Sequence, residues 1–284
     1  GGPRTDSGDQ AGDESSSGAL RGVTVRLFGG AAVLHDGAPV GGAAAHRHRV
    51  ALLAVLATSR RPVSRDKLIA LLWPERDTES ARNLLKVALH ALRKVLGEGA
   101  IRSIGDQLAV EETALRCDVM DFQAALDAEA DERAVGWYVG PFLDGFHLKE
   151  APDFERLVGE ERARLVQAYH GALERLAGAA EGRRDYAAAG RWWLRLAGHD
   201  PLRAGVSVRL MRALAVGGDV AGALRHAEIH TRLARETLDL DPDPAVVRLA
   251  SELRAAPAGR MPAAPNVGVT PDGGAAPMAV DPLP

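Results

Sequence analysis

The sequence predicts a mostly α protein in which an N-terminal α+β part is followed by an all-α part built from helical repeats. In the first part, short β-like runs stand before and after three helical patterns between residues 23 and 112. In the second part the apolar spacing is helical almost throughout, and similar residues recur 34 positions apart. A chain of 284 residues is long enough for two such domains.

The N-terminal part is expected to begin with short strands. Residues 23–40, VTVRLFGGAAVLHDGAPV, contain β-like runs, and Asp36-Gly37 marks a turn between two of them. The first helix is predicted over Arg47–Ser59, which has an amphipathic helical pattern. The following Arg60-Arg61-Pro62 should break that helix.

Two further helices follow with tight connections. Ser64 is the expected N-cap of the second helix, Asp66 lies in its first turn, and Pro74 should end it. A short loop then leads to the third helix, which is predicted from Thr78 to Leu96 and is stopped by Gly97.

The third helix combines an apolar stripe with a basic face. No acidic residue occurs between Ala81 and Gly97, whereas a solvated face usually mixes both signs, so this face indicates a polyanionic partner. The alternative is a solvated helix that happens to lack acidic residues. The predicted buried stripe comprises Ala81, Leu84, Leu85, Ala88, Leu89, Leu92, Val95 and Leu96, and the other side comprises Arg82, Asn83, Lys86, His90, Arg93 and Lys94.

A hairpin is predicted immediately after the third helix. Ile101–Ile104 and Gln107–Glu111 are β-like runs joined by Gly105-Asp106, which suits a two-residue hairpin loop. Three helices followed by such a wing have the order of a winged helix-turn-helix, in which the last helix enters the major groove of DNA. Arg102 on the wing can then reach a phosphate or the minor groove.

The second half repeats with a period of 34 residues, the length of a tetratricopeptide repeat, in which each unit is a pair of helices. This offset aligns Asp185 with Asp219 and Arg175 with Arg209, for example. Gly136–Phe146 is expected to be a turn-rich connector. The predicted helices are 119–128, 153–181, 185–198, 202–216, 219–237 and 243–254.

Charge and composition add three expectations. From Val23 to Glu112 there are 13 Lys and Arg against 9 Asp and Glu, whereas from Thr113 onward there are 20 against 25, so the positive charge is concentrated in the first part. Cys117 is the single cysteine, which excludes an internal disulfide. No run of about 18 apolar residues and no signal-peptide pattern is present, so we expect no membrane span and a cytoplasmic location.

Catalytic motifs are missing from the sequence. There is no phosphate loop of the form GxxxxGK[ST] and no GxSxG elbow. His46 and His48 lack further metal ligands nearby in the sequence, so a phosphate contact or a solvated helix end is the better interpretation of this pair. We therefore expect no enzymatic activity, no cofactor and no metal site.

These features together resemble a known family. Residues 23–115 resemble the OmpR-type winged helix, and residues 118–254 resemble the bacterial transcriptional activator domain. Both occur in the antibiotic regulatory protein family of transcriptional activators. The similarity rests on RVALLAVLA, VSRDKLIALLWPE, ESARNLLKVALHALRKVLG, DVMDF, GPFLDGF and LDLDPDPAV. It implies a winged-helix DNA-binding domain at 23–115 and an activator domain of helical repeats at 116–256, between disordered tails at 1–22 and 257–284.

The resemblance also implies a function. The chain is expected to bind double-stranded DNA carrying direct repeats, as a homodimer on that DNA, and to contact RNA polymerase holoenzyme at the nucleoid. The base-contacting candidates are Arg82, Asn83, Lys86 and His90. The phosphate-contacting candidates are Arg47, Arg49, Arg93, Lys94 and Arg102. The expected polymerase-facing loop comprises Trp73, Pro74, Glu75, Arg76 and Asp77.

Two alternatives stay open. One is a helical-repeat scaffold whose winged helix binds protein rather than DNA, which the modest basic excess allows. The other is the sensor portion of a larger signalling protein, with the Pro-rich tail as a linker. The 22 residues before Val23 are too few for a receiver domain, so regulation by phosphorylation of such a domain is not expected.

Overall fold

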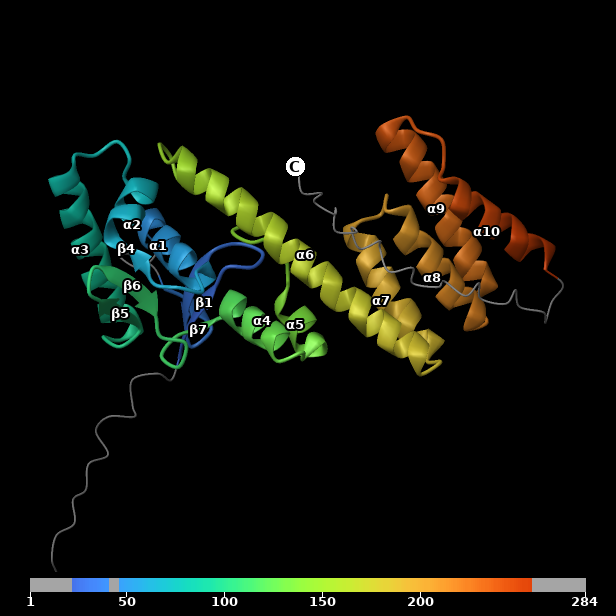
Figure 1. Cartoon of the computed structure of the whole chain (residues 1–284), viewed down its shortest axis with the longest axis horizontal. Coiled ribbons are helices and arrows are strands. Elements are labelled where there is room, and N and C mark those ends of the chain that lie inside the picture. Colours follow the sequence, from blue (N-terminus) through green and yellow to red (C-terminus); the bar gives the residue numbers. More distant parts are fainter. Residues whose placement is uncertain (1–21, 41–45, 257–284) are drawn as a thin grey trace, which may run out of the picture. The chain divides into compact units, whose positions relative to one another are not determined.

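The computed structural model describes residues 22–40 and 46–256 (Figure 1). Internal contacts divide the chain into two units, one through His199 and one from Asp200 onward. As predicted, the described chain is mostly helical, and its strands all lie at or before Cys117. The expected disordered tails at 1–22 and 257–284 fall almost wholly outside the described residues. No helix in the described ranges combines the length and apolarity needed to cross a bilayer.

A four-stranded sheet opens the first unit. It comprises β1 (Val23–Arg26), β2 (Ala32–His35), β3 (Ala38–Pro39) and β7 (Arg116–Cys117), in the order β3-β2-β1-β7. β1 pairs antiparallel with β2 and parallel with β7. Asp36 and Gly37 both adopt positive φ angles, 48° and 80°, which suits the predicted two-residue turn between β2 and β3.

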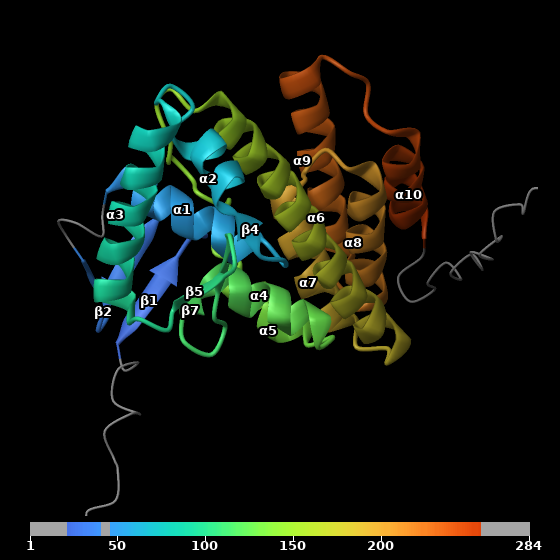
Figure 2. The same ribbon diagram turned by 60° about the vertical axis from the view of Figure 1, so that its left-hand side comes forward.

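The three predicted helices follow. They are α1 (Arg47–Thr58), α2 (Arg65–Leu72) and α3 (Thr78–Leu96) (Figure 2). The backbone N–H of Lys67 donates to the Ser64 side chain, and the N–H of Ser80 donates to Asp77, so both α2 and α3 have side-chain caps. Gly97, at φ 98°, ends α3 as the sequence predicts.

The wing is a small antiparallel sheet. β5 (Ile101–Ile104) and β6 (Gln107–Val110) form the predicted hairpin, and β4 (Val63–Ser64) pairs with β6. Because β4 lies directly before α2, this sheet ties the wing to the helix-turn-helix. The order of strands, three helices and wing is that of a winged helix-turn-helix.

Helices and the loops that connect them make up the rest of the described chain. They are α4 (Asp118–Asp127), α5 (Asp131–Trp137), α6 (Pro152–Gly182), α7 (Tyr186–His199), α8 (Ala204–Val216), α9 (Val220–Leu238) and α10 (Pro244–Ala255). The sequence analysis did not predict α5. This helix has only seven residues and buries only Ala134 and Val135, so it is too short to show a helical period.

The 34-residue repeat appears in the hydrogen bonds at the starts of α7 and α9. Asp185 accepts a hydrogen bond from the N–H of Ala188 at the start of α7, and Asp219 accepts one from the N–H of Gly222 at the start of α9. These aspartates occupy equivalent positions in the repeat. Helices α6 and α7 form one pair and α8 and α9 form another, as expected of tetratricopeptide-like repeats.

A buried carboxylate holds the start of α4 against the sheet. Asp118 accepts hydrogen bonds from the backbone N–H groups of Leu27 (2.9 Å), Phe28 (2.9 Å) and Val119 (2.8 Å). Burial raises the pKa of this carboxyl, and the three N–H donors oppose that rise. Phe28 then packs edge-on against Phe122 of α4, so the contact continues into the core.

Candidate nucleic-acid interface

Helix α3 buries a narrower arc than the sequence predicts. Leu84 was expected in the buried stripe, but it is 37% exposed, and Val95 is half-buried. Val87, which the sequence analysis left out of the stripe, is 50% exposed. The reason is that α3 packs against α1 and α2 along one arc only, and Leu84 lies at the margin of that arc. The fully buried residues are Ala81, Leu85, Ala88, Leu89, Leu92 and Leu96.

The four predicted base-contacting residues are all exposed on α3. Arg82 lies 3.3 Å from the carboxylate of Asp66 on α2, an ion pair open to solvent on both sides. Among the described residues, Asn83, Lys86 and His90 have no side-chain hydrogen bond or ion pair. The donors and acceptors on this part of α3 are therefore available to a ligand.

Two of the predicted phosphate-contacting residues are engaged at the wing. The Arg93 guanidinium donates to the carbonyl of Ile101 (Nε 3.1 Å, Nη2 2.9 Å) and to the hydroxyl of Ser103 (3.2 Å), which joins the last turns of α3 to β5. Arg102 forms an ion pair with Glu111 at 2.7 Å. Lys94 is exposed on α3. The structure thus groups these three cations around one end of α3.

The other two predicted phosphate-contacting residues lie elsewhere, in the first turn of α1. Arg47 donates to the backbone carbonyl of His147 at 2.6 Å, and its guanidinium lies 5.5 Å from the centre of the Phe146 ring. Arg49 is half-buried. Both residues line a hollow that is bordered by the loop between α2 and α3.

The predicted polymerase-facing loop has one buried and four exposed residues. Trp73 is only 8% exposed, because its indole stacks on the imidazole of His48. Pro74, Glu75, Arg76 and Asp77 are exposed. Hydrogen bonding from the N–H of Ser80 lowers the pKa of Asp77, which keeps this N-cap ionised. The surface of the loop is therefore supplied by its last four residues.

The hollow beside this loop has a volume of about 950 Å³. We call it the loop cavity. Its wall is formed by the start of α1, the loop, the exposed apolar side of α3 and the connector before α6. It is lined by His46, Arg47, His48, Arg49, Leu72, Trp73, Pro74, Glu75, Arg76, Leu84, Val87, Ala88, Gly145, His147, Leu148, Lys149 and Glu150.

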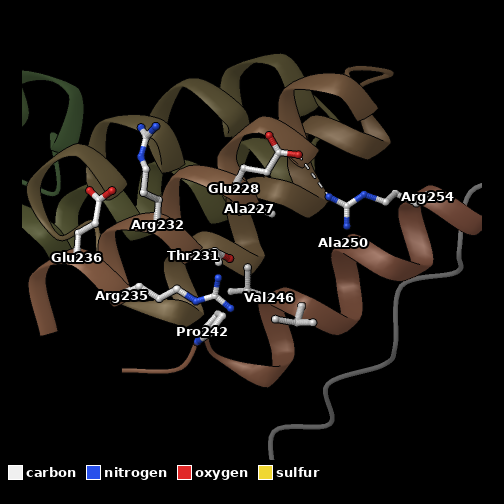
Figure 3. A pocket seen from close by; sticks show the side chains of 11 residues that line it. Ala227, Glu228, Thr231, Arg232, Arg235, Glu236, Pro242, Val246, Ala250 and Arg254 are labelled. Atoms are coloured by element: carbon white, nitrogen blue, oxygen red, sulfur yellow. Dashed lines mark hydrogen bonds and ion pairs between the residues drawn. The ribbon is translucent and has the colours of Figure 1, made fainter. Parts of the chain in front are cut away.

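A second hollow, of about 600 Å³, lies between α9 and α10 in the other unit (Figure 3). Figure 3 shows the guanidinium of Arg235 extending toward Pro242 and Val246. On the same groove, Glu228 and Arg254 form an exposed ion pair at 3.4 Å. This groove combines an apolar floor with charged edges, which suits a protein or peptide ligand.

Part of the chain matches a known protein family. The family model described as the bacterial transcriptional activator domain matches residues 107–254, which is more than half of the chain. The chain belongs to this family. The match bears out the resemblance of the second half of the chain to this domain.

One solved structure is similar to this chain over most of its length. It is described as "Mycobacterium tuberculosis EmbR in complex with low affinity phosphopeptide", with 22% sequence identity and a TM-score of 0.55. The match covers 82% of this chain and 65% of the EmbR chain, so this chain spans less than two thirds of that protein's length. At this identity the likeness shows a shared fold. No curated protein matches the chain.

Neither a cluster of metal ligands nor an exposed cysteine is found in the described part of the chain. Within the described ranges, no three His, Cys, Asp or Glu side chains are placed to hold a metal ion. Burial raises the pKa of Cys117 to about 12, so its thiol stays protonated at neutral pH. His48, which was expected at a phosphate contact or a solvated helix end, instead packs on Trp73.

Sequence reasoning missed the loop cavity. Its connector residues, Leu148 and Lys149, lie 60 to 76 positions from the α3 and loop residues opposite them, so no local pattern joins the two. One signal was present. Val87 interrupts the basic face of α3 with a large apolar side chain, and an apolar residue there indicates a contact other than solvent.

Proposed function

We propose that this activator binds double-stranded DNA in a sequence-specific manner, with α3 in the major groove and the wing against the adjacent backbone. The observation that supports this most strongly is the set of unpaired polar side chains on α3. Asn83, Lys86 and His90 are exposed and have no partner within the described chain, and no acidic residue lies between Ala81 and Gly97. Such a surface suits the base edges and phosphates of a duplex.

The proposed contacts follow the chemistry of each side chain. Arg82 can hold guanine with two hydrogen bonds and Asn83 can hold adenine, while Lys86 and His90 contact neighbouring base edges. Lys94 and Arg102 contact phosphates beside the wing. Arg93 chiefly positions the wing, because its guanidinium already donates to Ile101 and Ser103. Arg47 and Arg49 are weaker candidates for phosphate contacts, because both line the loop cavity.

The proposal extends to the transcription machinery. The exposed loop from Pro74 to Asp77 is proposed to contact RNA polymerase holoenzyme, and two protomers are proposed to bind direct repeats side by side as a homodimer on DNA. Residues 23–115 would form the DNA-binding domain and residues 116–256 the activator domain. This role places the protein in the bacterial cytoplasm and requires no catalysis.

The first test is selection of bound sites from a random DNA pool, read by sequencing, at about 0.15 M salt. We expect a repeated motif with its two copies about one helical turn apart. The Lys86→Glu variant should lose this enrichment, because it places a carboxylate against DNA. Arg248→Glu, an exposed charge reversal on α10, serves as the matched control and should keep it. Enrichment of nothing above background with the unaltered protein would contradict sequence-specific binding.

A protein-interaction scaffold is the second candidate function. It is favoured by the groove between α9 and α10, whose apolar floor and charged edges suit a protein ligand. The exposed apolar residues Ile229 and Val247 on these two helices add to it. This candidate predicts that Arg235→Glu weakens binding to a partner protein and leaves DNA selection unchanged.

A further inference from the structure

The hollow between α9 and α10, which we call the α9–α10 groove, holds an open cation above an apolar floor. Ala227 and Ala250 form the floor, one from each helix, and Val247 beside them is 44% exposed. The guanidinium of Arg235 extends toward Val246 (Figure 3) and has no hydrogen bond or ion pair with the described side chains. Because the floor consists of small residues, the groove has room for an extended segment with modest side chains.

The charges along the groove favour an acidic occupant. Three arginines line it, Arg232, Arg235 and Arg254, against Glu228 and Glu236. Glu228 is already paired with Arg254 at 3.4 Å. Two arginines therefore remain against one glutamate, which leaves the groove with a net positive charge that attracts a carboxylate.

The described chain ends beside this groove. Arg254 lines the groove, and the last described residue, Ala256, lies only two positions further along. The sequence continues to Pro284, and between Pro271 and Pro284 its charged side chains are Asp272 and Asp281 alone. Residues 278–284 read MAVDPLP, in which apolar side chains flank the carboxylate of Asp281. This composition is complementary to an apolar floor with a positive edge.

The lengths of the segment and the groove also agree. Helix α10 has 12 residues, so it is about 18 Å long. Seven extended residues such as 278–284 span about 23 Å. The intervening residues, 257–277, form a linker for which a root-mean-square end-to-end distance of about 25 Å is typical. Such a tether raises the effective concentration of the segment at the groove to the millimolar range.

We propose that residues 278–284 of this chain bind in the α9–α10 groove, antiparallel to α10. Met278 covers Val247, and the carboxylate of Asp281 pairs with Arg235. Pro282 suits this position because it has no N–H group that burial would leave unsatisfied. The contact lies within one chain and does not depend on the proposed DNA contact. A partner protein that uses the same groove has to displace this segment first.

A second copy of the chain is a poorer occupant. A hollow of about 600 Å³ receives only a few side chains, whereas a stable dimer interface buries about 1,600 Å². The groove therefore matches one short segment better than the folded surface of another protomer.

The first experiment uses the full chain with Val247→Cys and Met278→Cys. Oxidation by copper phenanthroline and oxygen removes one hydrogen from each thiol and joins the two sulfurs. The native Cys117 does not compete, because it is buried and its pKa is raised to about 12. We expect a disulfide within one chain, mapped by mass spectrometry after proteolysis.

The matched control replaces Val247→Cys by Arg248→Cys. Residue 248 is the exposed neighbour on α10 and does not line the groove. Because the tether is almost the same, the control pair should form the disulfide at a rate lower by about fivefold or more if the segment is held in the groove. Equal rates for the two pairs, or a disulfide mainly between two chains, would overturn the proposal.

A charge exchange tests the ion pair. Adding Arg235→Glu to the first cysteine pair should slow disulfide formation about threefold, within the range of an exposed ion pair. Adding Asp281→Arg as well should restore the rate, which a general loss of structure at Arg235 would not allow. Far-ultraviolet circular dichroism checks that each variant is folded. If the rate is unchanged by the first substitution or not restored by the second, Asp281 does not pair with Arg235. No DNA is present, so the result is independent of the outcome of DNA selection.

Discussion

The imidazole of His48 stacks on the indole of Trp73, with ring centroids 5.3 Å apart and planes inclined by only 6°. His48 lies in the first turn of α1 and Trp73 is the C-cap of α2. The stack therefore holds the start of the α2–α3 loop against α1. Burial, followed by the charge of His46, lowers the pKa of His48, so the stacked ring is neutral at pH 7.

We expect His48→Ala to destabilise the protein by about 1 kcal/mol, the typical value of a stacked ring pair beyond its buried area. It should also reduce activated transcription, because the loop loses its support. Urea unfolding followed by circular dichroism measures the first effect. His46→Ala, an exposed neighbour, is the control and should change stability little. Equal effects of the two substitutions would show that the stack contributes nothing specific.

Acidic pH should destabilise the protein through histidines whose pKa is lowered on folding. The pKa of His226 falls below its usual 6.5 because of burial and then the nearby His230, and its Nε2 lies 3.1 Å from the Ser207 hydroxyl. The unfolded state then takes up protons first, so stability is full above pH 6.5 and falls as the pH drops below it. Urea unfolding at several pH values should show a smaller fall for His226→Gln. If the free energy of unfolding falls equally in both proteins, His226 does not contribute to the loss of stability at acidic pH.

Asp118→Ala should be strongly destabilising. It leaves the buried N–H groups of Leu27 and Phe28 without an acceptor, and each unsatisfied buried group costs about 1–3 kcal/mol. We expect a loss of at least about 2 kcal/mol in urea unfolding. Asp121→Ala, on the same helix and without a side-chain hydrogen bond to the described backbone, is the matched control. A loss no greater than that of the control would contradict the anchoring role.

Base and phosphate contacts should respond differently to substitution. Asn83→Ala is expected to cost about 1–3 kcal/mol on the selected DNA site and to relax preference at one base position. Lys94→Ala should weaken binding to all sequences alike and reduce the salt slope by about one unit. Titrations at several salt concentrations, on the selected and on a scrambled site, separate the two. If both variants change the base preference, or both change only the salt dependence of binding, the division into base and phosphate contacts is wrong.

Features that depend on residues a few positions apart could be predicted from the sequence. Ser64 predicted the start of α2 and Gly97 the end of α3, because caps form through hydrogen bonds between near neighbours in the chain. The 34-residue spacing likewise predicted equivalent positions for Asp185 and Asp219, and in the structure each accepts a hydrogen bond at the start of a helix. The Gly105-Asp106 turn predicted the wing hairpin for the same reason.

Which surfaces these elements leave exposed depends on how the elements pack in three dimensions. Leu84 and Leu85 are adjacent and identical in type, yet one is 37% exposed and the other 2%, because burial depends on where α1 and α2 pack on α3. Arg93 is a cation on a basic face, and only the position of the wing makes it a donor to Ile101. The loop cavity joins residues from α1 to the connector before α6. Such contacts arise from packing between segments far apart in sequence, which no local periodicity encodes.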